Sequence, residues 1–320
     1  MIRVAINGYG RIGRVAHRVI LEKYNRTIEV VAINAGSSTD IKGWMYLLKY
    51  DTAYGPLLAH HIQADDKKDS IDHEPLIGHL TIDGKSIPVL SEKDPSRLPW
   101  RELDVDVVIE STGAFRKEEQ LKAHLQAGAK AVVLSAPEKG GEIPTYVISV
   151  NEKDYKGEDV ISNASCTTNC ITPVAKVMED NFGIEKAMMT TVHGYTSDQR
   201  LQDGGHKDYR RARAAGQNII PTSTGATEAA AKAMPSLEGK FSGLALRVPV
   251  ITGSLSDFTF VLGGNTTVEE INDVFRKAAE SKEYKGILQV TQDPLVSSDI
   301  IGNPHSAIVD LSLTQVVGGN

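Results

Sequence analysis

The sequence predicts an α/β fold in which a doubly wound parallel sheet precedes an α+β domain with a mixed or antiparallel sheet. A glycine-rich turn joins a strand pattern at residues 3–6 to a helical pattern. Strand and helix patterns then alternate, which is typical of parallel βαβ units. Later segments such as residues 254–262 alternate in polarity as antiparallel strands do. We place the domain boundary near residue 165, which gives domains 1–165 and 166–320.

The first βαβ pattern predicts dinucleotide binding. Strand 3–6 leads into Asn7-Gly-Tyr-Gly-Arg-Ile-Gly13, then into a helix with Ile12, Val15 and Val19 on one face, and strand 29–33 follows. In this context the G-x-G-x-x-G spacing of Gly8, Gly10 and Gly13 is typical of a Rossmann-type fold. The glycines permit a tight turn and let a pyrophosphate approach the helix N-terminus. The alternative is a glycine-rich turn without a ligand.

The end of the second strand bears on the choice of cofactor. NAD-binding proteins are expected to carry a carboxylate here for the ribose 2′-hydroxyl, but this strand ends in Asn34-Ala35-Gly36-Ser37-Ser38. No carboxylate repels a 2′-phosphate, and small hydroxyl side chains could donate hydrogen bonds to it. We therefore expect Asn34 and Ala35 at the cofactor site and favour NADP use or dual specificity. A simple turn that still binds NAD is the alternative.

The rest of the first domain supplies further strand ends. Residues 51–100 look like a β-rich excursion with short strands at 80–82 and 87–90, and the charged run 65–69 indicates a solvated loop. The parallel pattern resumes with a strand at 105–109, a helix at 117–127 and a strand at 131–134. Ligands of open α/β sheets lie off the carboxyl ends of strands. Thr112 and Ser135 follow such ends, so they are cofactor candidates, although either could be only a cap.

Cys166 is the candidate nucleophile. The segment 161–170 passes from β-type residues to small polar ones and then to a helical pattern with Val174, Val177 and Met178. Cys166 therefore falls at or near the first turn of a helix, where backbone N–H groups and the macrodipole favour a thiolate. The alternative is a small buried hydrophobic residue.

His193, which follows a strand at 187–192, is the candidate base. An imidazole near the Cys166 sulfur would favour the thiolate and exchange protons with the substrate. A thiolate with a nicotinamide implies an aldehyde substrate: a thiohemiacetal forms, hydride leaves, and a thioester remains. N–H groups at the helix start could hold the oxyanion. The alternative for His193 is a hydrogen-bonded structural residue.

Basic and hydroxyl residues of the second domain are typical of phosphate binding. Guanidinium groups bind phosphate in a forked geometry, and hydroxyls and helix-start N–H groups add donors. The candidates are Arg210, Arg211, Arg213 and Arg247, with Ser165, Thr167, Thr196, Thr224 and Gly225. A solvated helix face at 206–213 and a small nucleic-acid patch are the alternatives.

The totals exclude several classes of function. A net charge of −6 argues against nucleic-acid binding. No apolar run is long enough to span a membrane, and we expect no signal peptide at the amino end. Cys166 and Cys170, the two cysteines, make a poor zinc site and an improbable structural disulfide. We therefore expect no metal and a reducing, cytoplasmic setting.

Six segments carry a resemblance to a known family. They are I-N-G-Y-G-R-I-G-R at 6–14, L-L-K-Y-D-T at 47–52, S-N-A-S-C-T-T-N-C at 162–170, R-R-A-R-A-A at 210–215, N-I-I-P-T-S-T-G-A at 218–226 and L-R-V-P at 246–249. Together they resemble glyceraldehyde-3-phosphate dehydrogenase of the phosphorylating type over essentially the whole chain. The nine-residue cysteine motif is highly specific to this family and the related erythrose-4-phosphate dehydrogenase.

The resemblance implies oxidation of D-glyceraldehyde 3-phosphate to 1,3-bisphosphoglycerate, and the reverse, by a homotetramer that uses NAD or NADP. Cys166 would be the nucleophile and His193 the base. Substrate and inorganic phosphate would be held by Ser165, Thr167, Thr196, Arg210, Thr224, Gly225 and Arg247. Arg11, Ile12, Thr112 and Ser135 would contact the cofactor. Alternatives are erythrose-4-phosphate dehydrogenase, a non-catalytic dinucleotide-binding remnant, and a peroxide-sensing thiol.

The sequence departs from the family pattern at several places, among them Lys93, where members commonly carry Arg. NAD-using members carry Asp where this chain has Ala35, and they commonly carry Leu-Pro in place of Gly204-Gly205. NADP-using members relax both positions, which again favours NADP or dual use. Family members also continue past the position of Asn320 with a strand, an N-E-W-G-Y motif and a final helix. The resemblance therefore implies one of two things: either this sequence is truncated, or the product lacks a nicotinamide contact and a layer of core.

Overall fold

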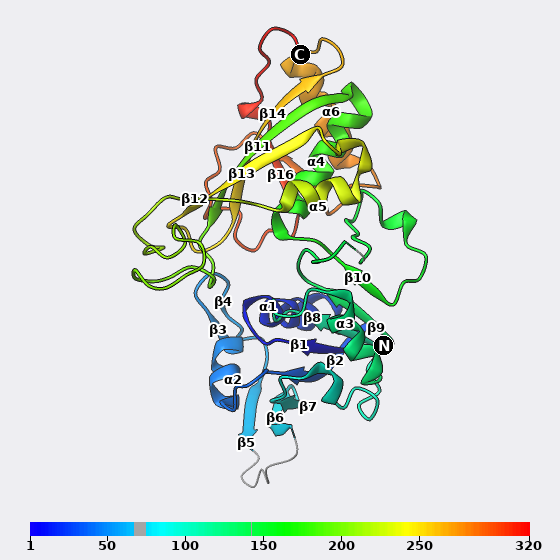
Figure 1. Ribbon diagram of the computed structural model, residues 1–320, viewed down its shortest axis with the longest axis vertical. Helices are drawn as coiled ribbons and strands as arrows, with labels where there is room; N and C mark the ends of the chain where they lie inside the picture. The colour runs from blue at the N-terminus through cyan, green and yellow to red at the C-terminus, as the bar shows by residue number, and fades with distance from the viewer. Residues whose placement is uncertain (67–74, 142) are drawn as a thin grey trace. The chain divides into compact units, whose positions relative to one another are not determined.

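The chain forms two compact units in a computed structural model that describes residues 1–66, 75–141 and 143–320. Met1–Thr145 and Lys156–Asn163 make the first unit, and Tyr146–Tyr155 and Ala164–Asn320 make the second. The chain thus contributes Tyr146–Tyr155 to the second unit and returns to the first unit for Lys156–Asn163. It enters the second unit again at Ala164, just before Cys166. Figure 1 shows the course of the chain through both units.

A sheet of eight strands, counted over the described residues, forms the centre of the first unit in the order β10-β9-β8-β1-β2-β7-β6-β5. Its strands are β1 (Ile2–Asn7), β2 (Ile28–Asn34), β5 (Ile62–Asp66), β6 (Leu76–Ile82), β7 (Lys85–Leu90), β8 (Val107–Glu110), β9 (Ala131–Leu134) and β10 (Val160–Ser162). All neighbours from β10 to β7 pair in parallel. The predicted doubly wound parallel sheet is confirmed.

The β-rich segment 51–100 extends this sheet. β7 pairs in parallel with β2, and β6 and β5 then continue the sheet in antiparallel pairs. Two short strands, β3 (Tyr50–Asp51) and β4 (Gly55–Pro56), form a separate hairpin. Asp65 and Asp66 of the charged run end β5, and the remainder of the predicted solvated loop lies outside the described residues.

Helices cover both faces of the sheet, which agrees with the continuous burial of residues 4–7 in β1. On β1, Ala5 packs in one hydrophobic cluster and Ile6 in the other, and Ala32 and Ile33 divide in the same way on β2. One cluster includes Leu121 of α3. The other includes residues of α2 and of the π-helical turn that extends α1. The helices are α1 (Arg11–Val19), the π-helix Ile20–Tyr24, α2 (Ile41–Lys49) and α3 (Glu118–Gln126).

The buried face of α1 differs from the predicted one. Ile12 is 57% exposed and Val19 is 37% exposed, whereas Arg14, His17 and Arg18 are buried. Backbone carbonyls compensate for this burial, because Arg14 Nη1 donates to the Tyr9 oxygen at 2.7 Å and Arg18 Nη2 donates to the Leu48 oxygen at 2.7 Å. Apolar spacing alone could not reveal these backbone acceptors.

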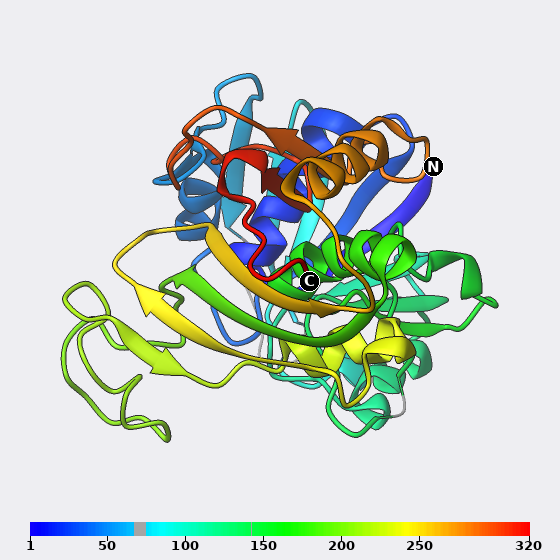
Figure 2. The ribbon, with the colours of Figure 1, turned by 90° about the horizontal axis from the view of Figure 1, so that it is seen from above.

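The second unit is built on a mixed four-stranded sheet in the order β12-β13-β11-β14. The strands are β11 (Ile184–Gly194), β12 (Ile220–Thr222), β13 (Phe241–Val248) and β14 (Ser254–Leu262), and Figure 2 shows the long ones running side by side. β11 pairs in parallel with β13 and antiparallel with β14, while β12 and β13 pair antiparallel. The predicted mixed sheet is confirmed. A parallel pair, β15 (Leu288–Thr291) and β16 (Ala307–Asp310), lies apart from it.

One face of the mixed sheet is covered by α4 (Cys166–Phe182), α5 (Ala226–Ala233) and α6 (Val268–Glu280), which Figure 1 shows on the same side of the strands. Side chains of these helices and of β11 and β14 form one buried cluster. The opposite face carries Met188, Val192, Leu244 and Leu255, which we call the outer sheet face. Met188 and Leu255 are 56% and 57% exposed. A capping box opens α6: the Thr267 side chain accepts from the Glu270 N–H, and the Glu270 side chain accepts from the Thr267 N–H.

No helix among the described residues combines the length and apolar character needed to cross a membrane.

Candidate active site

Cys166 is the first residue of α4, as predicted. Ser165 is the N-cap, and its hydroxyl accepts a hydrogen bond from the Thr168 N–H at 3.1 Å. The residue before it, Ala164, has a φ of 62°, a left-handed conformation that is rare for a residue with a side chain. Such strain is common at functional sites. The chain therefore turns sharply into the helix at the thiol.

His193 lies beside the thiol. Cys166 is exposed, and its Sγ lies 3.4 Å from His193 Nε2. The other ring nitrogen, Nδ1, lies 2.7 Å from the Gly194 carbonyl oxygen. A carbonyl can only accept, so Nδ1 carries the hydrogen and Nε2 presents its lone pair to the sulfur. The structure thus places a proton acceptor against the candidate nucleophile.

The two cysteines have different acidities. Partial desolvation of the Cys166 sulfur by its neighbours raises its pKa. The hydrogen bond and charge of His193 and hydrogen bonds from Thr167 outweigh this effect, so the pKa lies below its usual value. Burial raises the pKa of Cys170 to about 11. Cys170 packs against the hydrophobic cluster. Only Cys166 has the environment of a reactive thiolate.

Arg247 joins this site through the sheet. It pairs with His193 in the register of β13 and β11. Its Nη1 donates to the Gly194 oxygen at 3.2 Å and to the Thr196 hydroxyl at 3.3 Å. Its Nε is buried and has no hydrogen-bond partner among the described residues. Burial and the nearby charge of Arg211 lower the pKa of Arg247, while Cys166 and Asp198 raise it. A bound anion would offset the cost of this buried cation.

The starts of two helices meet near the thiol. Gly225 is the N-cap of α5, and the Thr224 hydroxyl accepts from the Ala226 N–H at 3.2 Å. The Thr168 hydroxyl donates to the Ala226 oxygen at 3.3 Å and so ties the first turn of α4 to that of α5. Helix N-termini favour anions. The predicted phosphate candidates Thr224 and Gly225 thus lie at one anion-favouring helix start, and Ser165 and Thr167 at the other.

The three arginines of the basic run differ in their contacts. Arg211 pairs with Asp198 at 2.7 Å and donates to the Thr222 hydroxyl at 2.9 Å, and Arg213 pairs with Asp203 at 2.7 Å. Arg210 is exposed and lines a pocket of about 550 Å³ with Thr222, Ser223 and Leu244. Among the described residues it forms no hydrogen bond or ion pair with Cys166 or His193. Sequence alone could not separate three neighbouring arginines, because their acceptors are supplied by other segments.

The glycine-rich turn of the first unit has the shape that a pyrophosphate needs. Gly8 has a φ of +94°, and a Cβ there would lie 2.6 Å from the Thr112 nitrogen. A Cβ on Gly13 would lie 2.2 Å from the Gly8 oxygen, which accounts for the close packing of helix on strand. A Cβ on Gly10, the N-cap of α1, would meet no atom within 4 Å. The residues present therefore fit a dinucleotide, whose phosphates would approach this open side of the turn.

The remaining cofactor candidates are placed as follows. Arg11 forms an ion pair with Asp51 and lies over the Tyr54 ring. Ile12 is exposed, whereas Asn34 is 2% exposed and bonds internally to Asn7 and Glu92. The Ala35 N–H donates to the Leu90 oxygen, and Gly36 follows with a φ of +69°. Thr112 follows β8, and Ser135 follows β9. Both lie at carboxyl ends of parallel strands, where ligands of such sheets bind.

No group of three or more His, Cys, Asp or Glu side chains placed to hold a metal occurs in the described ranges.

Comparisons with known proteins agree with this geometry. The family model described as "Glyceraldehyde 3-phosphate dehydrogenase, NAD binding domain" matches residues 2–118, and the one described as "Glyceraldehyde 3-phosphate dehydrogenase, C-terminal domain" matches residues 165–320. The chain is 50% identical over 320 residues to glyceraldehyde-3-phosphate dehydrogenase of Streptomyces coelicolor, covering 99% of this chain and 90% of that protein. It is 48% identical to the chloroplastic form A of Chlamydomonas reinhardtii, covering 99% and 81%. It is 45% identical to glyceraldehyde-3-phosphate dehydrogenase 2 of Bacillus subtilis, covering 99% and 88%. The chain therefore belongs to the glyceraldehyde 3-phosphate dehydrogenase family and is an NAD(P)-dependent oxidoreductase.

Proposed function

We propose that this chain oxidises D-glyceraldehyde 3-phosphate to 1,3-bisphosphoglycerate with inorganic phosphate, and catalyses the reverse reaction. The observation that carries the proposal is the 3.4 Å contact between Cys166 Sγ and His193 Nε2 at the start of α4. The thiol proton passes to His193 Nε2, the thiolate attacks the aldehyde carbon, and Nε2 returns the proton to the resulting alkoxide, which gives a thiohemiacetal linked through Cys166 Sγ. First-turn N–H groups of α4 stabilise the developing oxyanion.

His193 then serves as the base. Its Nε2 accepts the hydroxyl proton of the thiohemiacetal as hydride leaves the same carbon, which yields a thioester on Cys166. A bound nicotinamide dinucleotide supplies the hydride acceptor. Inorganic phosphate attacks the thioester carbonyl, the carbon–sulfur bond breaks, and the thiolate of Cys166 returns as the acyl phosphate departs. The lowered pKa of Cys166 suits both the attack and the departure of sulfur.

The substrate phosphate and inorganic phosphate are held by the arginine, hydroxyls and helix starts around the thiol. Arg247 has a buried, unpartnered Nε among the described residues, and its Nη1 already binds Thr196. A guanidinium binds phosphate through two parallel N–H groups. The further phosphate ligands in this proposal are Ser165, Thr167, Arg210, Thr224 and Gly225.

The first unit binds the dinucleotide through Gly8, Gly10, Arg11, Ile12 and Gly13, with Asn34, Ala35, Thr112 and Ser135 at neighbouring strand ends. We propose NADP use or dual specificity. Support comes from Ala35, which places no carboxylate where a 2′-phosphate would lie.

We also propose a homotetramer. The outer sheet face leaves Met188 and Leu255 more than half exposed within the single chain. Large apolar side chains exposed together on one sheet face support an interaction site there. A second copy of the same face is the proposed occupant, which makes this one of the isologous interfaces that a dihedral tetramer needs.

The test is an assay with purified protein, D-glyceraldehyde 3-phosphate, phosphate and either NADP or NAD, followed by reduced-nicotinamide absorbance. Without phosphate, a burst of about one equivalent per active site should replace steady turnover, because the thioester accumulates. Cys166→Ser is the matched control and should be inactive. A folded sample that is silent with both cofactors overturns the proposal. Faster turnover of erythrose 4-phosphate would assign the related activity instead.

A further inference from the structure

Glu110, the last residue of β8, is a fully buried carboxyl group at the edge of the sheet where the dinucleotide candidates lie. Four donors surround it. Oε1 accepts from the N–H of Thr112 at 2.8 Å and from its hydroxyl. Oε2 accepts from Asn7 Nδ2 and lies 3.2 Å from His124 Nε2. A buried charge persists only where such partners compensate for lost water.

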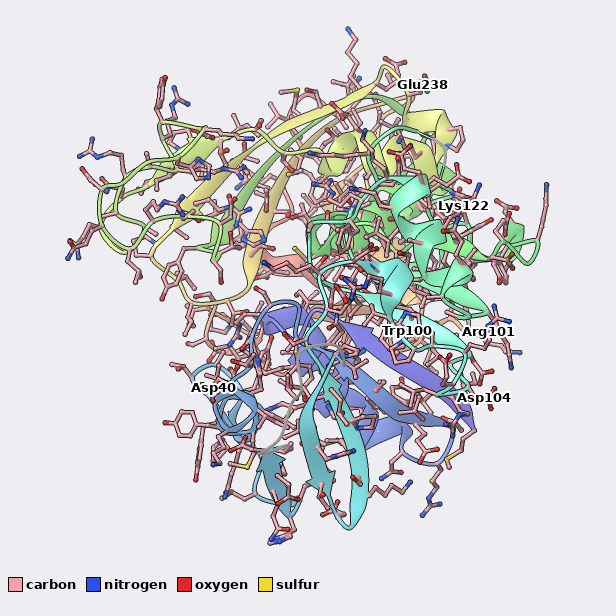
Figure 3. All side chains as sticks on the ribbon, turned by 60° about the horizontal axis from the view of Figure 1, so that its bottom comes forward. Asp40, Trp100, Arg101, Asp104, Lys122 and Glu238 are labelled. Atoms are coloured by element: carbon pink, nitrogen blue, oxygen red, sulfur yellow. The ribbon has the colours of Figure 1, made fainter. Side chains whose placement is uncertain are left out.

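Trp100 determines the direction of the bond from His124. Its indole Nε1, which can only donate, lies 2.9 Å from His124 Nδ1. Nδ1 is therefore the acceptor, and Nε2 carries the hydrogen that points at Glu110. Trp100 is fully buried in the segment between β7 and β8, and Figure 3 labels it. All four groups around the carboxyl are thus donors, which matches the carboxylate form of Glu110.

The same residue also anchors the neighbouring strand end. The Glu110 carbonyl oxygen accepts from the Ser135 N–H at 3.0 Å and from the Ser135 hydroxyl at 2.9 Å. On the other side, Asn7 Oδ1 accepts from Asn34 Nδ2 at 2.6 Å. Asn34 Oδ1 then accepts from the Glu92 N–H at 3.0 Å, just after β7. One hydrogen-bonded chain therefore crosses the carboxyl ends of β9, β8, β1, β2 and β7.

We propose that Glu110 is the positioning residue that holds the dinucleotide-binding loops in their binding geometry. This inference rests on the proposed function, which assigns Thr112, Ser135 and the Gly8 turn as contacts of the cofactor. A Cβ on Gly8 would lie 2.6 Å from the Thr112 nitrogen, so the two loops are nested and a shift of one displaces the other. Glu110 acts through these loops, and preorganised loops bind with less loss of freedom.

Glu110→Gln is the first test, because it keeps the shape and removes the charge. The amide of the new Gln can be oriented in two ways. In one, its NH₂ group faces the N–H and hydroxyl of Thr112; in the other, it faces the donors of Asn7 and His124. In both orientations a donor faces two donors, so hydrogen bonds are lost. We expect the Kd for the dinucleotide to rise by about 10- to 100-fold, as for losses of supporting hydrogen bonds behind a binding group. The KM for the aldehyde should stay unchanged, because its proposed ligands belong to the second unit.

A charge-swapped pair separates this role from a general loss of packing. Asn7→Asp alone sets two carboxylates against each other. In Asn7→Asp combined with Glu110→Gln, the new amide donates to the new carboxylate, whose other oxygen still accepts from Asn34. The His124 Nε2 lies 3.4 Å from the Asn7 Nδ2 position, so it can donate to the oxygen that replaces it. We expect the double variant to bind within about threefold of wild type, which is strong non-additivity.

The measurement is calorimetric titration of the full chain with NADP and with NAD, alongside thermal unfolding. Asp106→Asn is the control, because Asp106 accepts from the Arg3 N–H just before the amino end of the same strand. Its Kd should match wild type. If the wild-type protein binds the dinucleotide but does not turn over the aldehyde, the proposed function is rejected, and the role of Glu110 in binding can still be tested. Wild-type protein that binds no dinucleotide overturns both.

A folded Glu110→Gln with wild-type Kd overturns the proposal, and so does a folded double variant that remains weak. If neither folds, Trp100→Phe decides, since it keeps a ring in the core and removes only the donor to His124. Loss of one hydrogen bond should then raise the Kd about two- to tenfold. An unchanged Kd for Trp100→Phe overturns the proposal.

Discussion

His193 and Arg247 occupy paired positions on β11 and β13, and both donate to the carbonyl oxygen of Gly194. The hydrogen bonds to this shared acceptor orient both side chains. The imidazole uses its Nδ1 hydrogen there and turns Nε2 towards the Cys166 sulfur. The guanidinium keeps its Nε for another partner. The strand register thus couples the proton acceptor to the proposed phosphate-binding cation.

The acidity of Cys166 should depend on His193. In wild type, alkylation by iodoacetamide should show a midpoint pH below that of an ordinary thiol, and only one thiol should react near neutrality, because the pKa of Cys170 is about 11. His193→Ala removes the two largest effects that lower the pKa of Cys166 and leaves only the hydrogen bonds from Thr167, so the midpoint should move to higher pH. Turnover should fall by about 10²- to 10⁴-fold. An unchanged midpoint would contradict the assigned geometry, and Cys166→Ser supplies the unreactive control.

Arg247→Ala should weaken use of the phosphorylated substrate. Loss of charge-assisted hydrogen bonds costs about 1.5–3 kcal/mol, so kcat/KM for the aldehyde should fall roughly 10- to 100-fold. Arg247→Lys should recover little, because an ammonium cannot reproduce the fork. Steady-state kinetics would check this. Arg276→Ala, which loses surface ion pairs to Glu269 and Asp273, is the control. If Arg247→Ala and the control Arg276→Ala have the same kcat/KM, Arg247 does not bind the substrate phosphate.

Ala35→Asp should turn the cofactor preference towards NAD. The new carboxylate would face the 2′-phosphate of NADP, and juxtaposed like charges cost several kcal/mol. We expect the ratio of kcat/KM for NADP to that for NAD to fall by on the order of tenfold or more. Ala35→Asn has nearly the same shape without the charge, so it should change the ratio far less. A ratio that moves equally in both variants would show a steric effect rather than a charge effect.

Charges on the outer sheet face should disrupt assembly. Leu255→Glu or Met188→Glu would bury a carboxylate in the proposed interface between copies, which is unfavourable without a partner. Light scattering of the purified variants should give a lower mass than wild type. Leu313→Glu, at a residue 64% exposed in another part of the unit, should leave the mass unchanged. Wild-type mass for the two sheet variants would place the interface elsewhere.

Local chemistry explains which features the sequence predicts well. The start of α4 at Cys166 follows from the N-cap Ser165, and the start of α6 follows from the reciprocal bonds of Thr267 and Glu270. Both signals lie within a few neighbouring residues. Strand ends such as that before Thr112 are recognised for the same reason.

Long-range partners explain what the sequence does not predict. The inward face of α1 depends on carbonyl groups at Leu48 and Gly55, far along the chain. The network on Glu110 needs His124 and Asn7, which only the sheet order brings together. Arg211 differs from Arg210 because Asp198 reaches it. In each case the partner is chosen by tertiary packing, which single-sequence patterns do not encode.

The helix that opens with the reactive thiol runs on into the interior through Ile171, Val174 and Val177. Close packing of these apolar side chains holds the helix in place, and the helix in turn fixes the orientation of the Cys166 sulfur. Warming that loosens this packing should lower the rate at which iodoacetamide alkylates Cys166, at temperatures where circular dichroism still shows a folded protein. The reactivity of this thiol therefore reports on the packing of the domain interior.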